Sequence, residues 1–233
     1  MATANVNATR EAFMFGNQFP DWPSARFDPA GAAPNNYSTP TNATGIYVEY
    51  GTNRGGDYYT TRRAYFYWDL SSYAPNITAI DMNIELTGGG SPLLIQPAQS
   101  TLAFNGDGSA PLVGGEYDIT VPSDPPPSYA APFLNTAGVV QTGLNATAVS
   151  DANSQGFLIV QLIEHDYDYS DVDPTPFGYN IYSAEIRFAD GNNTLDITYT
   201  PPGYGNIVNG VAAANIVAVN GVATADIVNI IGV

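Results

Sequence analysis

The chain of 233 residues contains no cysteine and no lysine, and its only histidine is His165. Without cysteine there are no disulfides, no cysteine-ligated zinc, no iron–sulfur cluster and no thiol nucleophile. A single histidine excludes a multi-histidine metal centre and makes any Ser-His-Asp triad depend on His165. No Gly-x-Ser-x-Gly motif presents a serine nucleophile. Paired carboxylates for glycoside hydrolysis stay open, since they need only meet in space, but the sparse charges favour a protein that is not an enzyme.

Positive charge is also scarce, because 6 Lys+Arg against 22 Asp+Glu give a formal net charge of −16. Binding of nucleic acid requires clustered basic side chains, and an acidic surface repels DNA, RNA and anionic lipid alike. No apolar run approaches the ~20 residues of a membrane span. Residues 1–5 have neither the basic nor the apolar region of a secretion signal. We expect no nucleic-acid partner, no membrane insertion and no signal peptide.

The residues that are abundant favour β structure. The chain has 23 glycines, 18 prolines, 16 tyrosines and 10 phenylalanines, a composition typical of short strands separated by turns. A turn-rich stretch at 17–45 predicts an ordered surface excursion, and residues 145–153 predict one short helix. Alternating or continuous apolar patterns predict strands at 11–15, 46–50, 63–70, 77–86, 93–95, 116–121, 157–163, 181–188 and 194–199.

Several strands carry more detailed predictions. The run at 157–163 is apolar enough to lie centrally and be buried on both faces, and a turn at 190–193 predicts a terminal hairpin between the last two strands. Alternation in 63–70 predicts that Arg63, Tyr65, Tyr67 and Asp69 face outward. The predicted core positions of 63–70 and 77–86 are Ala64, Phe66, Trp68, Leu70, Ile80, Met82, Ile84 and Leu86. Together the patterns predict an all-β, jelly-roll-like β-sandwich over residues 1–200.

Residues 201–233 form a second unit that repeats itself every 11 residues. Asn209-Gly210-Val211 recurs as Asn220-Gly221-Val222, and Ile-Val pairs recur at the same spacing. Each unit is too short to bury its own apolar face, so it must stack on its neighbours, on the sandwich or on another chain. The predicted oligomerisation or docking residues are Val208, Asn209, Gly210, Val211, Ile216, Val219, Asn220, Gly221, Val222, Ile227, Ile230, Ile231 and Val233.

An arginine-led strand at 62–70 is followed by a Pro-Asn-Ile-Thr sequence and a second core strand up to Leu86. In this pattern the chain resembles DNRLRE-type β-sandwich domains. The segments 182–185 and 195–200 are also similar to that family, and the resemblance covers residues 11–200. The resemblance implies a β-sandwich of the kind found in secreted cell-surface proteins, some of which bind carbohydrate, and in phage structural proteins.

The tail carries a second resemblance. Its Asn-Gly-Val units are similar to C-terminal repeats of virion proteins of tailed phages and archaeal viruses, which reach the particle by assembly. This resemblance implies a non-enzymatic structural protein on the virion surface, as a capsid decoration or a head or tail fibre. The implied partners are further copies of the chain, as a homotrimer, and other virion proteins. The alternative is a carbohydrate- or host-receptor-binding module that recognises a host-surface glycan.

The acidic run at 164–173 is the densest cluster of hard oxygen ligands in the sequence. Its alternating oxygens resemble the start of a calcium loop, although the glycine and the distal glutamate of an EF-hand are missing. The alternative is a solvated loop whose like charges block edge-to-edge strand pairing. The candidate calcium ligands are Asp166, Asp168, Ser170, Asp171 and Asp173, and no other cofactor is expected.

Two further groups of residues have alternative interpretations. Trp22, Tyr58, Tyr59, Tyr65 and Tyr67 predict either a stacking platform for sugar rings or the lining of a subunit contact, where aromatic residues are also enriched. His165 is expected to be an exposed loop residue. Arg63 and Glu185, which both lie in the segments that carry the family resemblance, are expected to pair with each other across the sheet.

Overall fold

The computed structural model describes residues 1–15, 18–27, 33–37, 39–54, 56–88, 92–100, 125–174, 180–201, 218–219 and 222–223. The strand predicted at 116–121 lies outside these residues. The elements are, in chain order, β1 (Ala2–Asn7), β2 (Arg10–Phe15), α1 (Trp22–Phe27), β3 (Ala33–Tyr37), β4 (Thr41–Asn53), β5 (Gly56–Asp69), β6 (Ile77–Gly88), β7 (Leu94–Gln99), β8 (Phe133–Leu134), β9 (Gly138–Gly143), α2 (Ala146–Gln155), β10 (Phe157–Glu164), the π-helical turn η4 (His165–Tyr169), β11 (Asn180–Phe188), β12 (Thr194–Tyr199), β13 (Ala218–Val219) and β14 (Val222–Ala223).

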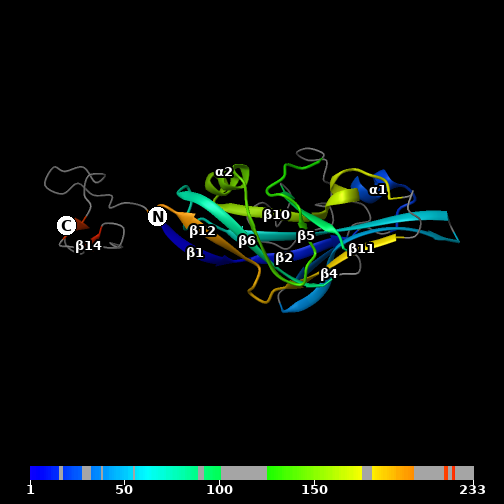
Figure 1. Ribbon diagram of the computed structural model, residues 1–233, viewed down its shortest axis with the longest axis horizontal. Helices are drawn as coiled ribbons and strands as arrows, with labels where there is room; N and C mark the ends of the chain where they lie inside the picture. The colour runs from blue at the N-terminus through cyan, green and yellow to red at the C-terminus, as the bar shows by residue number, and fades with distance from the viewer. Residues whose placement is uncertain are drawn as a thin grey trace.

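The strands of the main body form one antiparallel hydrogen-bonded network in the order β1-β12-β6-β11-β4-β5-β10-β7-β8. β2 pairs with β3 and β5, and β9 pairs with β6. The network folds over so that β10, β5 and β2 lie opposite β6 and β12, with β4 and β11 linking the two layers (Figure 1). The predicted all-β sandwich is confirmed.

The main hydrophobic core lies between the two layers. β5 contributes Phe66 and Trp68, and Phe66 stacks on Phe188 of β11 with ring centroids 5.9 Å apart and an interplanar angle of 7°. All eight predicted core positions are buried, as their alternation requires. They lie in β5 and β6, except for Leu70, which directly follows β5. β10 is buried along almost its whole length, which confirms its central position.

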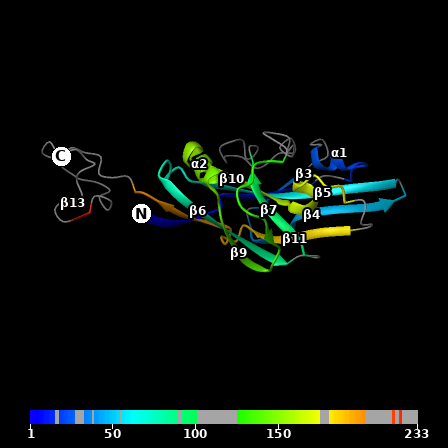
Figure 2. The same cartoon turned by 45° about the horizontal axis from the view of Figure 1, so that its top comes forward.

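The predicted short helix is confirmed as α2, which covers one end of the core in Figures 1 and 2. Asn145 caps it, because its side-chain oxygen accepts hydrogen bonds from the N–H groups of Thr147 and Ala148. Gly156 ends the helix with φ of 76°, a left-handed conformation that favours glycine. Ala148 and Ala152 are the side chains that α2 buries against the sandwich.

The predicted terminal hairpin between β11 and β12 is wrong. Both strands exist, but β12 pairs with β1 and the first part of β6, whereas β11 pairs with β4 and the last residues of β6. The segment at 189–193 therefore carries the chain from one pairing site on β6 to another. The stretch at 17–45 is also more regular than expected, since it contains α1, β3 and the start of β4.

The outward face of β5 is not solvated as predicted. Tyr65 and Tyr67 are buried in a second cluster with Ala12, Met14 and Ile159, and Arg63 is fully buried. Only Asp69 of the four expected outward residues is exposed. Alternation identified which side chains share a face, but both faces of this part of β5 are covered.

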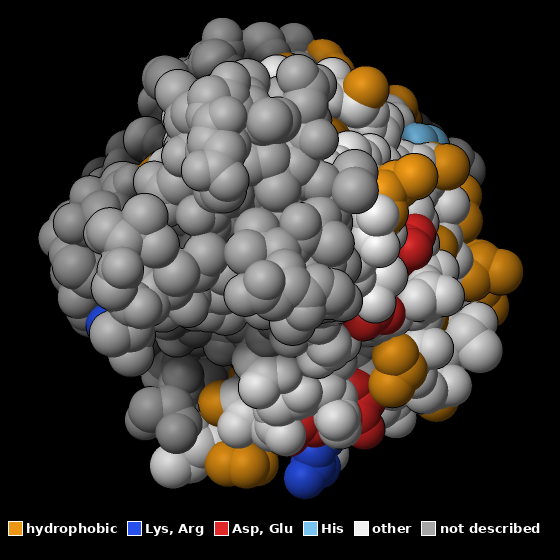
Figure 3. All heavy atoms as spheres, turned by 90° about the vertical axis from the view of Figure 1, so that its left-hand side faces the viewer, with side chains coloured by type: hydrophobic (Ala, Val, Ile, Leu, Met, Phe, Trp, Pro, Cys, Tyr) orange, Lys and Arg blue, Asp and Glu red, His pale blue; other side chains and the backbone are white. Residues whose placement is uncertain are grey.

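The end of the molecule beside the N-terminus is seen in Figure 3. The described surface in that view carries acidic side chains in several places, and the chain as a whole has a net charge of −16. No helix among the described residues is long and apolar enough to span a membrane.

Candidate functional site

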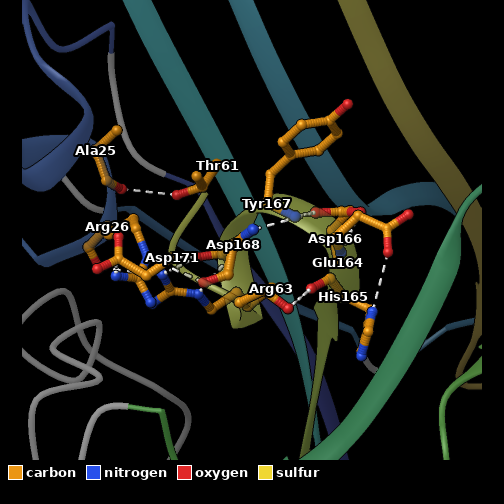
Figure 4. A network of polar contacts seen from close by, with 11 residues as sticks. Ala25, Arg26, Thr61, Arg63, Glu164, His165, Asp166, Tyr167, Asp168 and Asp171 are labelled. Carbon is orange, nitrogen blue, oxygen red and sulfur yellow. Dashed lines mark hydrogen bonds and ion pairs between the residues drawn. The ribbon is translucent and has the colours of Figure 1, made fainter. Parts of the chain in front are cut away.

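The acidic run predicted as a calcium loop folds into η4, directly after β10. Glu164, the last residue of β10, accepts hydrogen bonds from the backbone N–H groups of Asp166, Tyr167 and Asp168 at 2.8, 2.8 and 3.1 Å (Figure 4). These three N–H groups lack partners within the first turn of a helix, so a carboxylate there satisfies them. Glu164 therefore fixes the start of the turn.

Asp168 is held by the buried Arg63 of β5. The Arg63 Nε and Nη2 atoms donate to Asp168 Oδ2 and Oδ1 at 2.8 and 2.7 Å, and both side chains are 0% exposed. Such a two-bond guanidinium–carboxylate contact is geometrically specific and satisfies both carboxylate oxygens. The predicted pairing of Arg63 with Glu185 is wrong, because Glu185 is exposed and Arg63 reaches η4 instead.

Arg26 of α1 joins the same network. Its Nε atom donates to the backbone carbonyl of Asp168 at 2.9 Å, and its Nη1 atom lies 2.6 Å from Asp171 Oδ1. Arg63 also donates to the backbone carbonyl of Arg26 at 3.0 Å, and Thr61 donates to that of Ala25 at 2.7 Å. Figure 4 shows these side chains converging from α1, β5 and η4. The network thus fastens α1 and η4 onto the outer face of β5.

The five candidate calcium ligands do not converge. Asp168 is bound by Arg63, Asp171 contacts Arg26, and Asp166 lies 3.0 Å from His165 Nδ1. Ser170 donates its hydroxyl to the carbonyl of His165, and Asp173 is exposed. Within the described part of the chain, no group of three or more His, Cys, Asp or Glu side chains is placed to hold a metal. Calcium binding by these residues stays a prediction from the sequence.

His165 is the first residue of this turn, and its side chain is 28% exposed. Its ring stacks on Tyr169 with centroids 5.9 Å apart, and its Nδ1 atom contacts Asp166. The expectation of an exposed loop histidine is therefore only partly met, since His165 is partly covered and belongs to the π-helical turn.

Two buried glutamates have unusual ionisation, and sequence reasoning identified neither as important. Burial raises the pKa of Glu164 to about 7, although three backbone N–H groups oppose the shift. Burial likewise raises the pKa of Glu11 in β2 to about 7, opposed by hydrogen bonds from the Ala189 N–H at 2.6 Å and the Asn193 amide at 2.9 Å. The sequence signal that could have indicated their burial is the position of each glutamate within or at the end of an apolar strand.

Four of the five candidate aromatic residues are buried within the chain. Trp22 of α1 and Tyr59 of β5 pack in a cluster with Phe19, Ala25, Val48 and Tyr50. Tyr65 and Tyr67 lie in the separate cluster on the outer face of β5. Tyr58 is half-buried and donates its hydroxyl to Glu49 at 3.0 Å. The prediction of an exposed stacking platform for sugar rings is therefore wrong for these four side chains, because the chain's own packing covers their rings.

A polar array occupies the outer face of the other layer. Asp196 of β12 accepts from Asn5 of β1 at 2.7 Å and from Asn83 of β6 at 2.8 Å, and these amides hold its pKa below the usual range. A hollow of about 360 Å³ lies beside this array and is lined by Thr3, Ala4, Asn5, Asp81, Asp196, Ile197 and Thr198. The array ties β1 to the two strands next to it.

The described part of the repeats is one small hairpin. Val219 and Val222 face each other as partners in β13 and β14, as do Ala218 and Ala223. Asn220 and Gly221, which separate the two strands, lie outside the described residues, as do Val208, Asn209, Gly210, Val211, Ile216, Ile227, Ile230, Ile231 and Val233. The two strands pair only with each other among the described residues.

Comparison with known proteins gives no match to a protein-family model and no similar curated protein.

Proposed function

We propose that this chain is a non-enzymatic structural protein of a virus particle, displayed on the particle surface and assembled through its C-terminal repeats. The single observation that carries the proposal is the 11-residue repeat, which places strand-forming apolar residues on both sides of each Asn-Gly pair. The hairpin of β13 and β14 at one such pair supports this interpretation. A hairpin this small needs a partner surface to be stable.

The distribution of charge supports an assembly role for the tail. Of the 28 charged residues obtained by adding 22 acidic and 6 basic ones, only Asp226 lies between residues 201 and 233. Copies of a chain with a net charge of −16 repel each other, and an uncharged apolar segment is where that repulsion is weakest. The acidic sandwich would face the solvent, and the repeats would join the particle as a homotrimer or on other virion proteins.

The sandwich supplies a stable body to display. Among the described residues, its main core cluster is built from residues between Phe13 and Ile197. The resemblance to DNRLRE-type domains, some of which are phage structural proteins, supports the same role. A capsid decoration and a fibre are equally compatible with this arrangement.

The test is the mass in solution of the full chain beside a chain that ends at Thr200, measured by light scattering. We expect the full chain to be an oligomer and the shortened chain a folded monomer, with unchanged β-sheet circular dichroism. If both chains are monomers, self-assembly through the repeats is wrong. Screening the shortened chain against glycans would then test the carbohydrate- or receptor-binding alternative, whose predicted aromatic platform is largely buried.

A further inference from the structure

β1 is the first strand in the order of the sheet, and β12 is the strand that it pairs with. In the pairing of β1 with β12, Ala4 is the partner of Ile197 and Val6 of Leu195, with a regular register throughout. Among the described residues, no strand pairs with the other edge of β1. That edge offers a row of backbone groups to which another strand can add.

The register shows which backbone groups point to this edge. Ala8 donates its N–H to the carbonyl of Asn193 at 2.9 Å, which continues the register of β1 with β12. Residues two apart in a strand direct their N–H groups to the same side, so Ala4 and Val6 also bond toward β12. Thr3 and Asn5 therefore direct their N–H and C=O groups away from β12, toward the free edge.

β1 lacks the features that usually protect an edge strand. It contains no charged residue, no proline and no bulge, whereas protected edges carry one or more of these. Its core-side residues Ala2, Ala4 and Val6 are only half-buried, so an added strand would cover this flank of the core. Within the described part of the chain, the edge is thus both open and incompletely packed.

The chain also contains two strands that pair with no strand of the sandwich among the described residues. β13 and β14 form a separate two-stranded sheet that lies beyond the end of the sandwich beside the N-terminus (Figures 1 and 2). Both β1 and residues 201–225 are uncharged in a chain with a net charge of −16, so two copies can approach at these segments with the least repulsion.

We propose that the free edge of β1 receives a repeat segment from the tail of a second copy, by backbone hydrogen bonding through Thr3 and Asn5. This inference rests on the proposed function, since it names the surface on which the repeats dock. The repeats would supply the strand and β1 the edge, so each copy both gives and receives a strand. Such head-to-tail contacts form a closed ring, for example a trimer, where the rotation between copies closes, and an open filament where it does not.

The first test is backbone amide hydrogen exchange in the full chain and in the chain that ends at Thr200. We expect the amides of Thr3 and Asn5 to exchange at least about tenfold more slowly in the full chain, because they gain hydrogen bonds there. The amides of Ala4 and Val6 are the internal control, since they bond to β12 in both chains and should exchange equally.

The second test is a pair of proline variants of the full chain, examined by light scattering and thermal unfolding. Thr3→Pro removes an N–H that faces the free edge, and proline is tolerated at such positions, so we expect a folded protein with the mass of a monomer. Ala4→Pro removes an N–H that bonds to β12, so it should lower Tm as well. Equal Tm values for the two variants would contradict the assigned edge directions.

The outcomes separate this inference from the proposed function. If the full chain is an oligomer but Thr3 and Asn5 exchange as fast as in the shortened chain, the β1 edge is not the docking surface and assembly through the repeats stands. If those amides are protected in a monomeric full chain, the tail of the same copy occupies the edge, and docking between copies is overturned. If the full chain is a monomer without protection, self-assembly through the repeats and docking on the β1 edge are both wrong.

Discussion

Arg63 and Asp168 lie 105 positions apart in the sequence and form a fully buried ion pair with two hydrogen bonds of 2.8 and 2.7 Å. Arg26 contributes a third contact from α1, at 3.5 Å from Asp168 Oδ1. Because the pair is out of water, removing one partner leaves an uncompensated buried charge, whereas replacing both partners removes the charges together.

Asp168→Ala should therefore lower the free energy of unfolding by about 3–5 kcal/mol, the usual cost of breaking a buried pair from one side. Replacing both partners, as in Arg63→Met with Asp168→Leu, should cost less than Asp168→Ala alone. The matched control is Asp166→Ala in the same turn, whose side chain is 54% exposed and should change stability by about 0.5 kcal/mol or less. Urea unfolding measures all three, and equal losses for Asp166→Ala and Asp168→Ala would contradict the role assigned to the pair.

Glu164 and Glu11 should make the protein less stable as pH rises through neutrality. Each has a pKa raised from 4.5 to about 7 in the folded chain, so folding favours the protonated form. The contribution of each group is full below pH 4.5 and is lost as pH rises through about 7. We expect the free energy of unfolding, and with it Tm, to fall between pH 5.5 and pH 8. Each group should contribute on the order of 1–3 kcal/mol to the loss of unfolding free energy.

The variants Glu11→Gln and Glu164→Gln test the assignment, because glutamine does not titrate. Each variant should have a shallower dependence of Tm on pH over this range than the parent chain, whatever its absolute Tm. Glu185→Gln is the control, since Glu185 is exposed and its replacement should leave the dependence on pH unchanged. A parent chain with constant Tm from pH 5.5 to pH 8 would rule out these shifts.

Removal of divalent cations should leave Tm unchanged at pH 7. Both carboxylate oxygens of Asp168 accept from Arg63, and Asp171 contacts Arg26, so the positive charge that these carboxylates need is already supplied by the chain. The measurement is thermal unfolding with EDTA and with added calcium. A fall of several degrees with EDTA that calcium reverses would instead support the calcium loop predicted from the acidic run.

Local pattern in the sequence indicated the strands that carry most of the core, but not β1, β3, β8 or β9. Alternation with a period of two is a property of neighbouring residues, so Phe66, Trp68, Ile80 and Met82 could be assigned to the core without knowing which strands pair. The cap of α2 at Asn145 is similarly local. The apolar run of β10 was long enough to indicate burial on both faces.

Tertiary structure alone decided the pairing of strands and the partners of buried charges. The sequence indicated a hairpin between β11 and β12, but the two strands occupy different parts of β6, and pairing depends on loop closure and on the packing of the whole sheet. Arg63 was placed on an outward face, and nothing near it in the sequence revealed that α1 and η4 would cover that face. Periodicity reports which residues share a side of a strand, whereas the partner of a buried charge is set by contacts between residues far apart in the chain.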